Sequence, residues 1–154
     1  MNDVVIASVA RTPIGAFLGG LSSVPASYLG QVAIKETLKR GGIDAAEVDD
    51  VIMGQVLTAA CGQNPARQAA LAAGIPVEKT AITINQVCGS GLRSVALGIQ
   101  AIKTSDSAIV VAGGQESMSQ SPHASNLRFG QKMGDLQYID TMIKDGLWCA
   151  TNGY

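Results

Sequence analysis

Cys88 is the residue whose type and setting most directly suggest chemistry. The β-branched run at 80–84 comes just before it and predicts a buried strand. Apolar residues at helical spacing come after it: Leu92, Val95, Ala96, Ile99 and Ile102. The thiol is therefore expected at the first turn of a helix, where unpaired backbone N–H groups and the helix dipole favour an anion. This position favours the thiolate, which is the nucleophilic form.

Two glycines beside the cysteine bear on what it could attack. Because Gly89 and Gly91 lack a β-carbon, a substrate carbonyl can approach the backbone closely at these positions. Neighbouring N–H groups can then stabilise an oxyanion. The pattern favours a cysteine nucleophile that becomes acylated. The alternative is a buried structural cysteine, because free cysteine is among the most buried residue types.

The other candidates for chemistry are scattered along the chain. Cys61 and Cys149 are interpreted as structural or packed residues. His123 is the only histidine, and a cysteine hydrolase could use it as the base for Cys88, but a histidine in a Ser/Pro loop is more often solvated. Glu116 is expected to accept hydrogen bonds rather than to act as a general base. No metal site is predicted, because such a site needs clustered ligands.

Composition and charge argue against several classes of protein. Apolar residues make up 47% of the 154 residues and charged residues 15%, which indicates one globular domain with a real core. The net charge of −1 gives no sign of nucleic-acid binding. The sequence has neither a long apolar window nor a basic leader, so no membrane span or signal peptide is expected. Three widely spaced cysteines favour a reducing compartment, and we expect the cytoplasm.

Strand-like and helix-like segments alternate over most of the chain. Strands are predicted at 4–10, 51–57, 80–86 and 108–112, and helices at 26–40, 66–73 and 89–103. This order predicts an α/β fold with a mostly parallel sheet covered by helices on both faces. Residues 1–118 are predicted to form this α/β domain. Residues 119–154 show no clean period and are predicted to begin a second unit, a loop domain that these residues do not complete.

Several motifs carry a family resemblance. The main one is the stretch 84–95, with Asn85, Cys88, Gly89, Ser90 and Gly91 at fixed spacing. Further segments agree in order at 11–21, 54–56, 62–67 and 113–119. Together they resemble the thiolases, the acetyl-CoA acetyltransferases, in which the first stretch is the acyl-enzyme signature. The resemblance is to the biosynthetic, acetoacetyl-CoA-forming branch, and it extends over essentially the whole chain as the amino-terminal two-fifths or so of such an enzyme.

The resemblance implies a reaction and two site residues. Cys88 would take an acetyl group from acetyl-CoA, with its own backbone N–H as one oxyanion donor, and a second acetyl-CoA would then condense to acetoacetyl-CoA. The reverse reaction is thiolysis. Leu147 falls where the family lines its pantetheine channel. The substrates are coenzyme A thioesters, and no metal or prosthetic group is implied.

The resemblance also implies partners for the chain. The family places an activating histidine, a second cysteine and the other oxyanion groups in a carboxyl-terminal half, so the 154 residues alone are expected to be inactive. A homodimer or homotetramer is expected, with the strand near 80–86 at the dimer interface and the loop near 123–138 joining dimers. No nucleic-acid or membrane partner is expected.

Two alternatives stay open. A ketoacyl synthase of the same superfamily also acylates a cysteine at the start of a helix, but its carrier-protein partner would favour a basic entrance to the site. An inactive fragment with an assembly role belongs to a different class. An activity assay on the chain alone and then with its carboxyl-terminal half would separate these alternatives.

Overall fold

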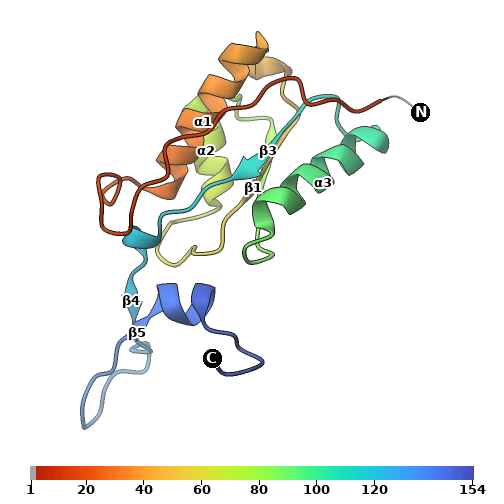
Figure 1. Ribbon diagram of the computed structural model, residues 1–154. Coiled ribbons are helices and arrows are strands. Elements are labelled where there is room, and N and C mark those ends of the chain that lie inside the picture. Colours follow the sequence, from red (N-terminus) through yellow and green to blue (C-terminus); the bar gives the residue numbers. More distant parts are fainter. Residues whose placement is uncertain (1–2) are drawn as a thin grey trace.

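The computed structural model describes residues 3–154. A three-stranded parallel sheet in the order β2-β1-β3 lies at its centre, formed by β1 (Asp50–Gly54), β2 (Thr80–Ile84) and β3 (Val110–Gly114). Helices α1 (Ala26–Gly41) and α2 (Pro65–Ala73) lie on one side of the sheet, and α3 (Ser90–Lys103) lies on the other (Figure 1). The predicted α/β fold with a parallel sheet between helices is confirmed.

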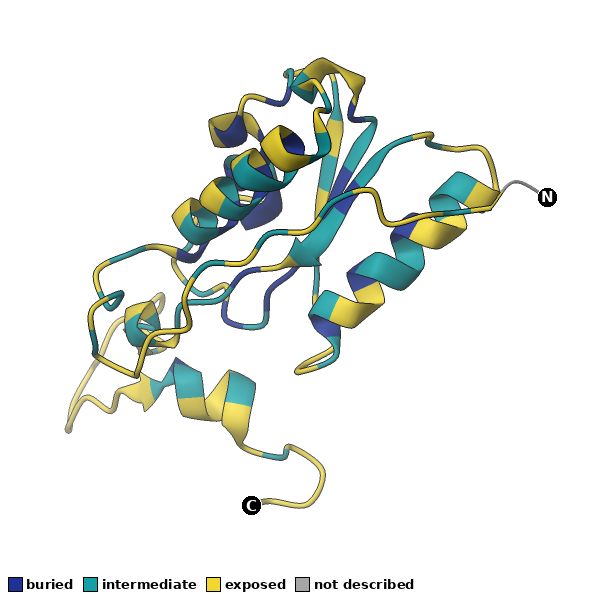
Figure 2. Cartoon of the chain, turned by 45° about the horizontal axis from the view of Figure 1, so that its top comes forward, coloured by how far each residue is buried: buried dark blue, intermediate teal, exposed yellow. Residues whose placement is uncertain are grey.

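The main core lies between the sheet and the α1–α2 pair. Alanines occupy the buried side of α2, so that α1 packs closely against it. In Figure 2 the buried residues concentrate between these helices and the strands. The core cluster consists of Ile34, Leu38, Val48, Val51, Met53, Ala66, Ala69, Ala70, Ala73, Ile75 and Val111.

Helix α3 approaches the opposite face of the sheet through small residues. Its buried positions are Ser90, Ser94 and Gly98. A Cβ added to Gly54 at the end of β1 would lie 2.5 Å from the backbone carbonyl carbon of Ser90, so only glycine allows this approach. By contrast, the apolar stripe that predicts this helix turns partly to solvent, and Leu92 is 79% exposed.

The termini of α2 are fixed by capping residues. Asn64 is the N-cap and its Oδ1 accepts a hydrogen bond from Arg67 N at 3.2 Å. Pro65 occupies the first helical position, where a missing N–H costs nothing. Gly74 ends the helix in the left-handed conformation, with its N–H bonded to Ala70 O and Leu71 O.

The strands depart from their predicted bounds. The expected strand at 4–10 does not form, because its backbone joins no ladder among the described residues and Val5 and Ile6 are exposed. A strand needs a paired neighbour as well as β-branched residues. The second and third strands end earlier than expected, at Gly54 and Ile84, and the fourth is displaced to Val110–Gly114.

The last part of the chain leaves the sheet. It contains the short 3₁₀ helix η2 (Met118–Gln120), an antiparallel pair β4 (His123–Ala124) and β5 (Ile139–Asp140), and the π-helix η3 (Met142–Leu147). The long connection between β4 and β5 extends away from the α/β body, whereas η3 lies below the sheet (Figure 1). The division into two domains at residue 118 stays a prediction. Across residues 3–154, no helix is long and apolar enough to cross a lipid bilayer.

Candidate active site at the carboxyl ends of the strands

The turn that carries Cys88 joins β2 to α3 and is closed by two side chains. Asn85 Oδ1 accepts a hydrogen bond from Val87 N at 2.8 Å. Ser90 Oγ accepts from Gln86 N at 2.8 Å and donates to Val87 O at 2.6 Å. Because Ser90 is buried and bonds both Gln86 N and Val87 O, it constrains the backbone of the turn.

Val87 adopts an unusual backbone conformation next to the nucleophile candidate. Its φ is +48°, in the left-handed region that β-branched residues rarely enter. Such a conformation costs on the order of 1–3 kcal/mol and persists where surrounding bonds enforce it. Here the bonds to Asn85 and Ser90 supply that enforcement, and the turn presents Cys88 as an exposed side chain.

The backbone around Cys88 offers hydrogen-bond donors. Helix α3 begins at Ser90, and its first internal bond runs from Arg93 N to Gly89 O at 2.8 Å. Within residues 3–154, the N–H groups of Cys88, Gly91 and Leu92 donate to no protein acceptor. These free donors lie at the positive end of the helix dipole, so the turn can stabilise negative charge on a bound carbonyl oxygen.

Cys88 and Leu147 line the same cavity of about 410 Å³. The first comes from the β2–α3 turn and the second from the end of η3, so residues far apart in the sequence meet here. The walls are mostly apolar and come from the carboxyl ends of the strands, a common site for ligands in open α/β sheets. They consist of 54–57, Val87, Cys88, Ser90, Gly91, 114–116, Met118, Gly146 and Leu147.

Polar side chains tie the ends of β1 and β3 together beneath this cavity. Gln55 is 1% exposed; its Oε1 accepts from Gln115 Nε2 at 2.9 Å, and its Nε2 donates to Leu57 O at 2.8 Å. Glu116 accepts from the N–H groups of Val56 at 2.9 Å and Leu57 at 3.1 Å, which confirms the predicted role as an acceptor. Burial raises the pKa of Glu116 above its ordinary value, and these two N–H bonds oppose that rise.

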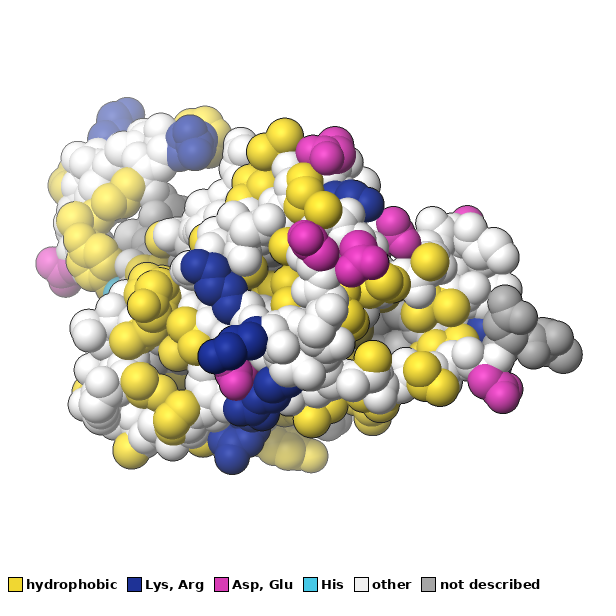
Figure 3. Space-filling model, turned by 90° about the horizontal axis from the view of Figure 1, so that it is seen from above, with side chains coloured by type: hydrophobic (Ala, Val, Ile, Leu, Met, Phe, Trp, Pro, Cys, Tyr) yellow, Lys and Arg dark blue, Asp and Glu magenta, His cyan; other side chains and the backbone are white. Residues whose placement is uncertain are grey.

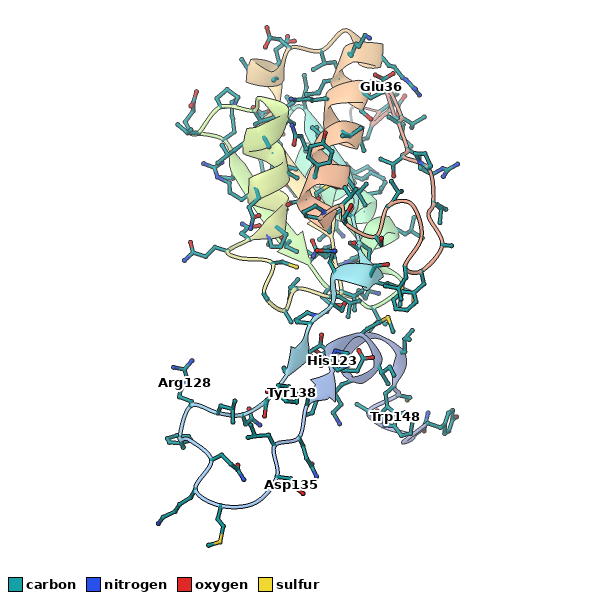
Figure 4. All side chains as sticks on the ribbon, turned by 90° about the vertical axis from the view of Figure 1, so that its left-hand side faces the viewer. Glu36, His123, Arg128, Asp135, Tyr138 and Trp148 are labelled. Carbon is teal, nitrogen blue, oxygen red and sulfur yellow. The ribbon has the colours of Figure 1, made fainter. Side chains whose placement is uncertain are left out.

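The remaining candidates lie away from the Cys88 cavity. The His123 side chain is 63% exposed and lies at the root of the long loop (Figure 4), with its Nε2 3.9 Å from Asp140 Oδ2. Cys61 lines a separate cavity beside the start of α1. The Cys149 thiol accepts from Asn152 N at 3.4 Å, and this backbone N–H bond lowers its pKa. The residues that line the cavity shared by Cys88 and Leu147 include none of these three side chains.

Sequence reasoning missed the residues that shape the site without acting in it. Asn85, Ser90, Gln55 and Gln115 were not predicted to hold the turn or the strand ends. The available signal for Asn85 was its position two residues before Val87, where an Asx turn can form. Buried glutamines give no comparable signal, because their partners come from distant strands.

Comparison with known proteins fits this geometry. The family model described as "Thiolase, N-terminal domain" matches residues 4–154. The chain belongs to the thiolase family. Its relatives include proteins named acetyl-CoA acetyltransferase from Paracoccus denitrificans (58% identical over 154 residues), Rhizobium meliloti (60% over 152) and Pseudomonas aeruginosa (52% over 155).

The alignments with these relatives cover nearly all of this chain but only part of each relative. The alignments include 99–100% of this chain but only 39% of each relative, so the chain spans about two-fifths of their length. The resemblance inferred from the motif around Cys88 is thus confirmed at the level of the family and of its amino-terminal part.

Proposed function

We propose that this chain is the nucleophile-bearing part of an acetyl-CoA acetyltransferase and that Cys88 is its acyl acceptor. The observation that carries the proposal is the exposed thiol on a strained turn beside three free N–H donors, in a cavity that Leu147 also lines. The names of the relatives support the choice of acetyl-CoA as substrate.

The first half-reaction is acyl transfer to sulfur. The Cys88 thiolate attacks the carbonyl carbon of acetyl-CoA, and a tetrahedral oxyanion forms that the Cys88 N–H can bind. The bond to the coenzyme A sulfur then breaks, and coenzyme A leaves as a thiolate that takes up a proton. The acetyl group remains as a thioester on Cys88.

The second half-reaction forms the new carbon–carbon bond. A base removes a proton from the methyl group of a second acetyl-CoA, and the resulting carbanion attacks the acetyl-cysteine carbonyl. The bond to Cys88 sulfur breaks and acetoacetyl-CoA leaves, which regenerates the thiolate. The remainder of the full-length protein would supply this base and the one that activates the thiol. The proposal needs no metal or prosthetic group.

The assembly and location of the protein are part of the proposal. Strand β2 lies at one edge of the sheet, and Ile82 on it is about half exposed. Such an edge can pair with a second copy, which supports a homodimer or a homotetramer. The three cysteines are free, which is compatible with the cytoplasm. Light scattering on the full-length protein tests the assembly.

Turnover assays on cysteine variants test the proposed role of Cys88. In the full-length protein, Cys88→Ala should abolish formation of acetoacetyl-CoA from acetyl-CoA. The matched controls Cys61→Ala and Cys149→Ala should retain most of the activity, because neither thiol lines the Cys88 cavity. Full activity in the Cys88→Ala variant would overturn the proposal.

The second candidate function is a role in assembly without catalytic activity. Turnover measurements on the 154-residue chain and on the full-length protein test it. Without the second base and the remaining oxyanion donors, the 154-residue chain should lose several powers of ten in rate, since each lost donor costs about 10²–10³-fold. If the full-length protein also fails to form acetoacetyl-CoA, the assembly role is favoured. Ordinary turnover by the chain alone would contradict the need for a remainder.

A further inference from the structure

Among the described residues, Glu116 supplies the one carboxylate in the wall of the Cys88 cavity. It follows β3 and is half-buried, and its two oxygens accept from consecutive N–H groups just after β1, those of Val56 at 2.9 Å and Leu57 at 3.1 Å. No ion pair in residues 3–154 includes Glu116. Its charge is therefore stabilised by backbone N–H groups rather than by a cation.

The segment that Glu116 holds contacts both the turn that carries Cys88 and the helix η3 that carries Leu147. On one side, Asn85 Nδ2 makes a long 3.5 Å hydrogen bond to Val56 O, and Asn85 Oδ1 accepts from Val87 N in the nucleophile turn. On the other side, Leu57 packs against Gly146, where an added Cβ would lie 3.1 Å from Leu57 Cδ2. The pair Val56–Leu57 thus forms part of the wall of the cavity that Cys88 and Leu147 share.

The hydrogen bonds explain why a carboxylate occupies this position. An ionised carboxylate accepts from both N–H groups at once, whereas an apolar side chain would leave two donors unsatisfied beside the cavity. A glutamine side chain would satisfy only one, because its NH₂ group would face the other N–H. Both oxygens already have donors, so Glu116 is poorly placed to remove a proton from substrate.

We propose that Glu116 is a positioning residue for acyl transfer at Cys88, whose ionised carboxylate fixes the Val56–Leu57 wall against which an acyl thioester lies. This inference rests on the proposed function. It adds a residue that acts through the backbone, by setting where the carbonyl carbon sits relative to the Cys88 sulfur. A misplacement of about 1 Å in such a wall can cost about 10²-fold in rate.

The pH dependence offers a readout specific to this role. Because burial raises the pKa of Glu116, its carboxylate becomes protonated at a higher pH than an unperturbed carboxyl group would. Protonation replaces one acceptor with an O–H donor and breaks one of the two bonds to the wall. The titratable groups facing the same region are Cys88, in the shared cavity, and Arg11, in the neighbouring cavity that Glu116 also lines.

Kinetics on the full-length protein test the proposal. Glu116→Gln should lower kcat by about 10²-fold with little change in KM for acetyl-CoA. Glu116→Asp, which keeps the charge, should recover part of that loss. The acid-side fall of kcat attributed to Glu116 should be absent from the Gln variant. The control Glu36→Gln, at an exposed ion pair on α1, should leave kcat and KM unchanged.

Alkylation of Cys88 separates this inference from the proposed function. The rate of its reaction with iodoacetamide, followed by peptide mass mapping, needs no acyl transfer. It should change several-fold in Glu116→Gln while circular dichroism stays unchanged, even if the protein never condenses acetyl-CoA. Wild-type alkylation together with wild-type kcat in a folded Glu116→Gln variant would overturn the proposal. So would equal losses in the Gln and Asp variants.

Discussion

Backbone strain at Val87 directs the thiol of Cys88 at the scale of single residues. A β-branched residue at a φ of +48° is held there by Asn85 Oδ1 and by Ser90 Oγ. Strained backbone of this kind concentrates at functional sites, where the rest of the fold enforces it. In the part of the chain that the structure describes, the Cys88 N–H donates to no acceptor. The geometry of one turn thus places an exposed thiol beside a backbone donor, as the proposed function requires.

Replacing Gly54 by alanine should disturb the turn that carries Cys88, because Gly54 lies against the start of α3. The new Cβ would lie 2.5 Å from Ser90 C and 2.7 Å from Gly91 N, which are backbone atoms and cannot move independently. We expect a loss of about 1–3 kcal/mol in the free energy of unfolding, from overpacking. We also expect slower alkylation of Cys88, because the start of α3 must shift.

The control for Gly54→Ala comes from the neighbouring strand. In Gly113→Ala the new Cβ would meet only Met53, at 3.6 Å from Sδ, which is ordinary contact. Urea denaturation should place this variant close to the wild type. Equal stability of the two variants would show that the close approach of α3 to β1 is unimportant.

At the residue scale, the sequence predicted where Cys88 and Glu116 lie better than it predicted the side chains that support them. The position of Cys88 at a strand-to-helix junction and that of Glu116 just after a strand follow from local pattern, because both can be recognised without tertiary contacts. Gln55 and Gln115 could not be found this way. Their hydrogen bond joins strands 60 residues apart, and no local spacing encodes it.

At the scale of elements, Asp49 joins the start of β1 to its two neighbouring segments. Its Oδ2 accepts from Ala108 N at 2.8 Å and Ile109 N at 3.1 Å, and its Oδ1 lies 3.3 Å from Lys79 Nζ. These groups, the Ala108 N–H first among them, hold the pKa of Asp49 below its ordinary value of 3.8. Asp49 therefore fixes the register of β1 against the entry to β3.

The sign of this pKa shift predicts an acid-sensitive contribution. Because the folded state holds the pKa of Asp49 down, the carboxylate stabilises the fold at pH values above 3.8, and this stabilisation is lost as the pH falls through the lowered pKa. Asp49→Asn should be less stable than the wild type at neutral pH, and the difference should shrink in acid. Asp135→Asn, in the long loop, should show no such trend. A constant difference across this pH range would contradict the assignment.

Helices and strands were predicted correctly where a local signal fixes the end of the element. They were predicted wrongly where pairing with a neighbouring strand decides whether the element forms. Helix α2 follows its caps, Asn64 and Gly74. The segment at 4–10 has strand-forming residues but no ladder in the described structure. Helix α3 is recognised from its apolar stripe, yet its contact with the sheet uses Ser90, Ser94 and Gly98. Periodicity therefore reveals that a helix exists more reliably than which side it buries.

At the scale of the whole molecule, much apolar surface is exposed. Figure 3 shows hydrophobic side chains spread across one face between charged groups. On α3, Leu92 and Ile99 are exposed, and so are the apolar side chains of the amino-terminal segment, Val5, Ile6 and Val9. Exposed apolar surface of this extent marks an interface or a site of aggregation. The proposed function implies that the remainder of the full-length protein covers this apolar surface.

Light scattering and dye binding test this prediction. The 154-residue chain alone should associate and bind a hydrophobic dye, and the full-length protein should bind much less dye per chain. A monodisperse monomer that unfolds cooperatively and binds no dye would mean that these surfaces need no cover, and that the chain behaves as a complete domain.

The central claim is that Cys88 carries the acyl group. The most direct measurement is to mix the full-length protein with acetyl-CoA, quench in acid and map the acetylated peptide by mass spectrometry, with Cys88→Ala as the control. We expect acetyl on the peptide that contains Cys88, and none on it in the variant. Acetyl on Cys61 or Cys149 instead would contradict the account.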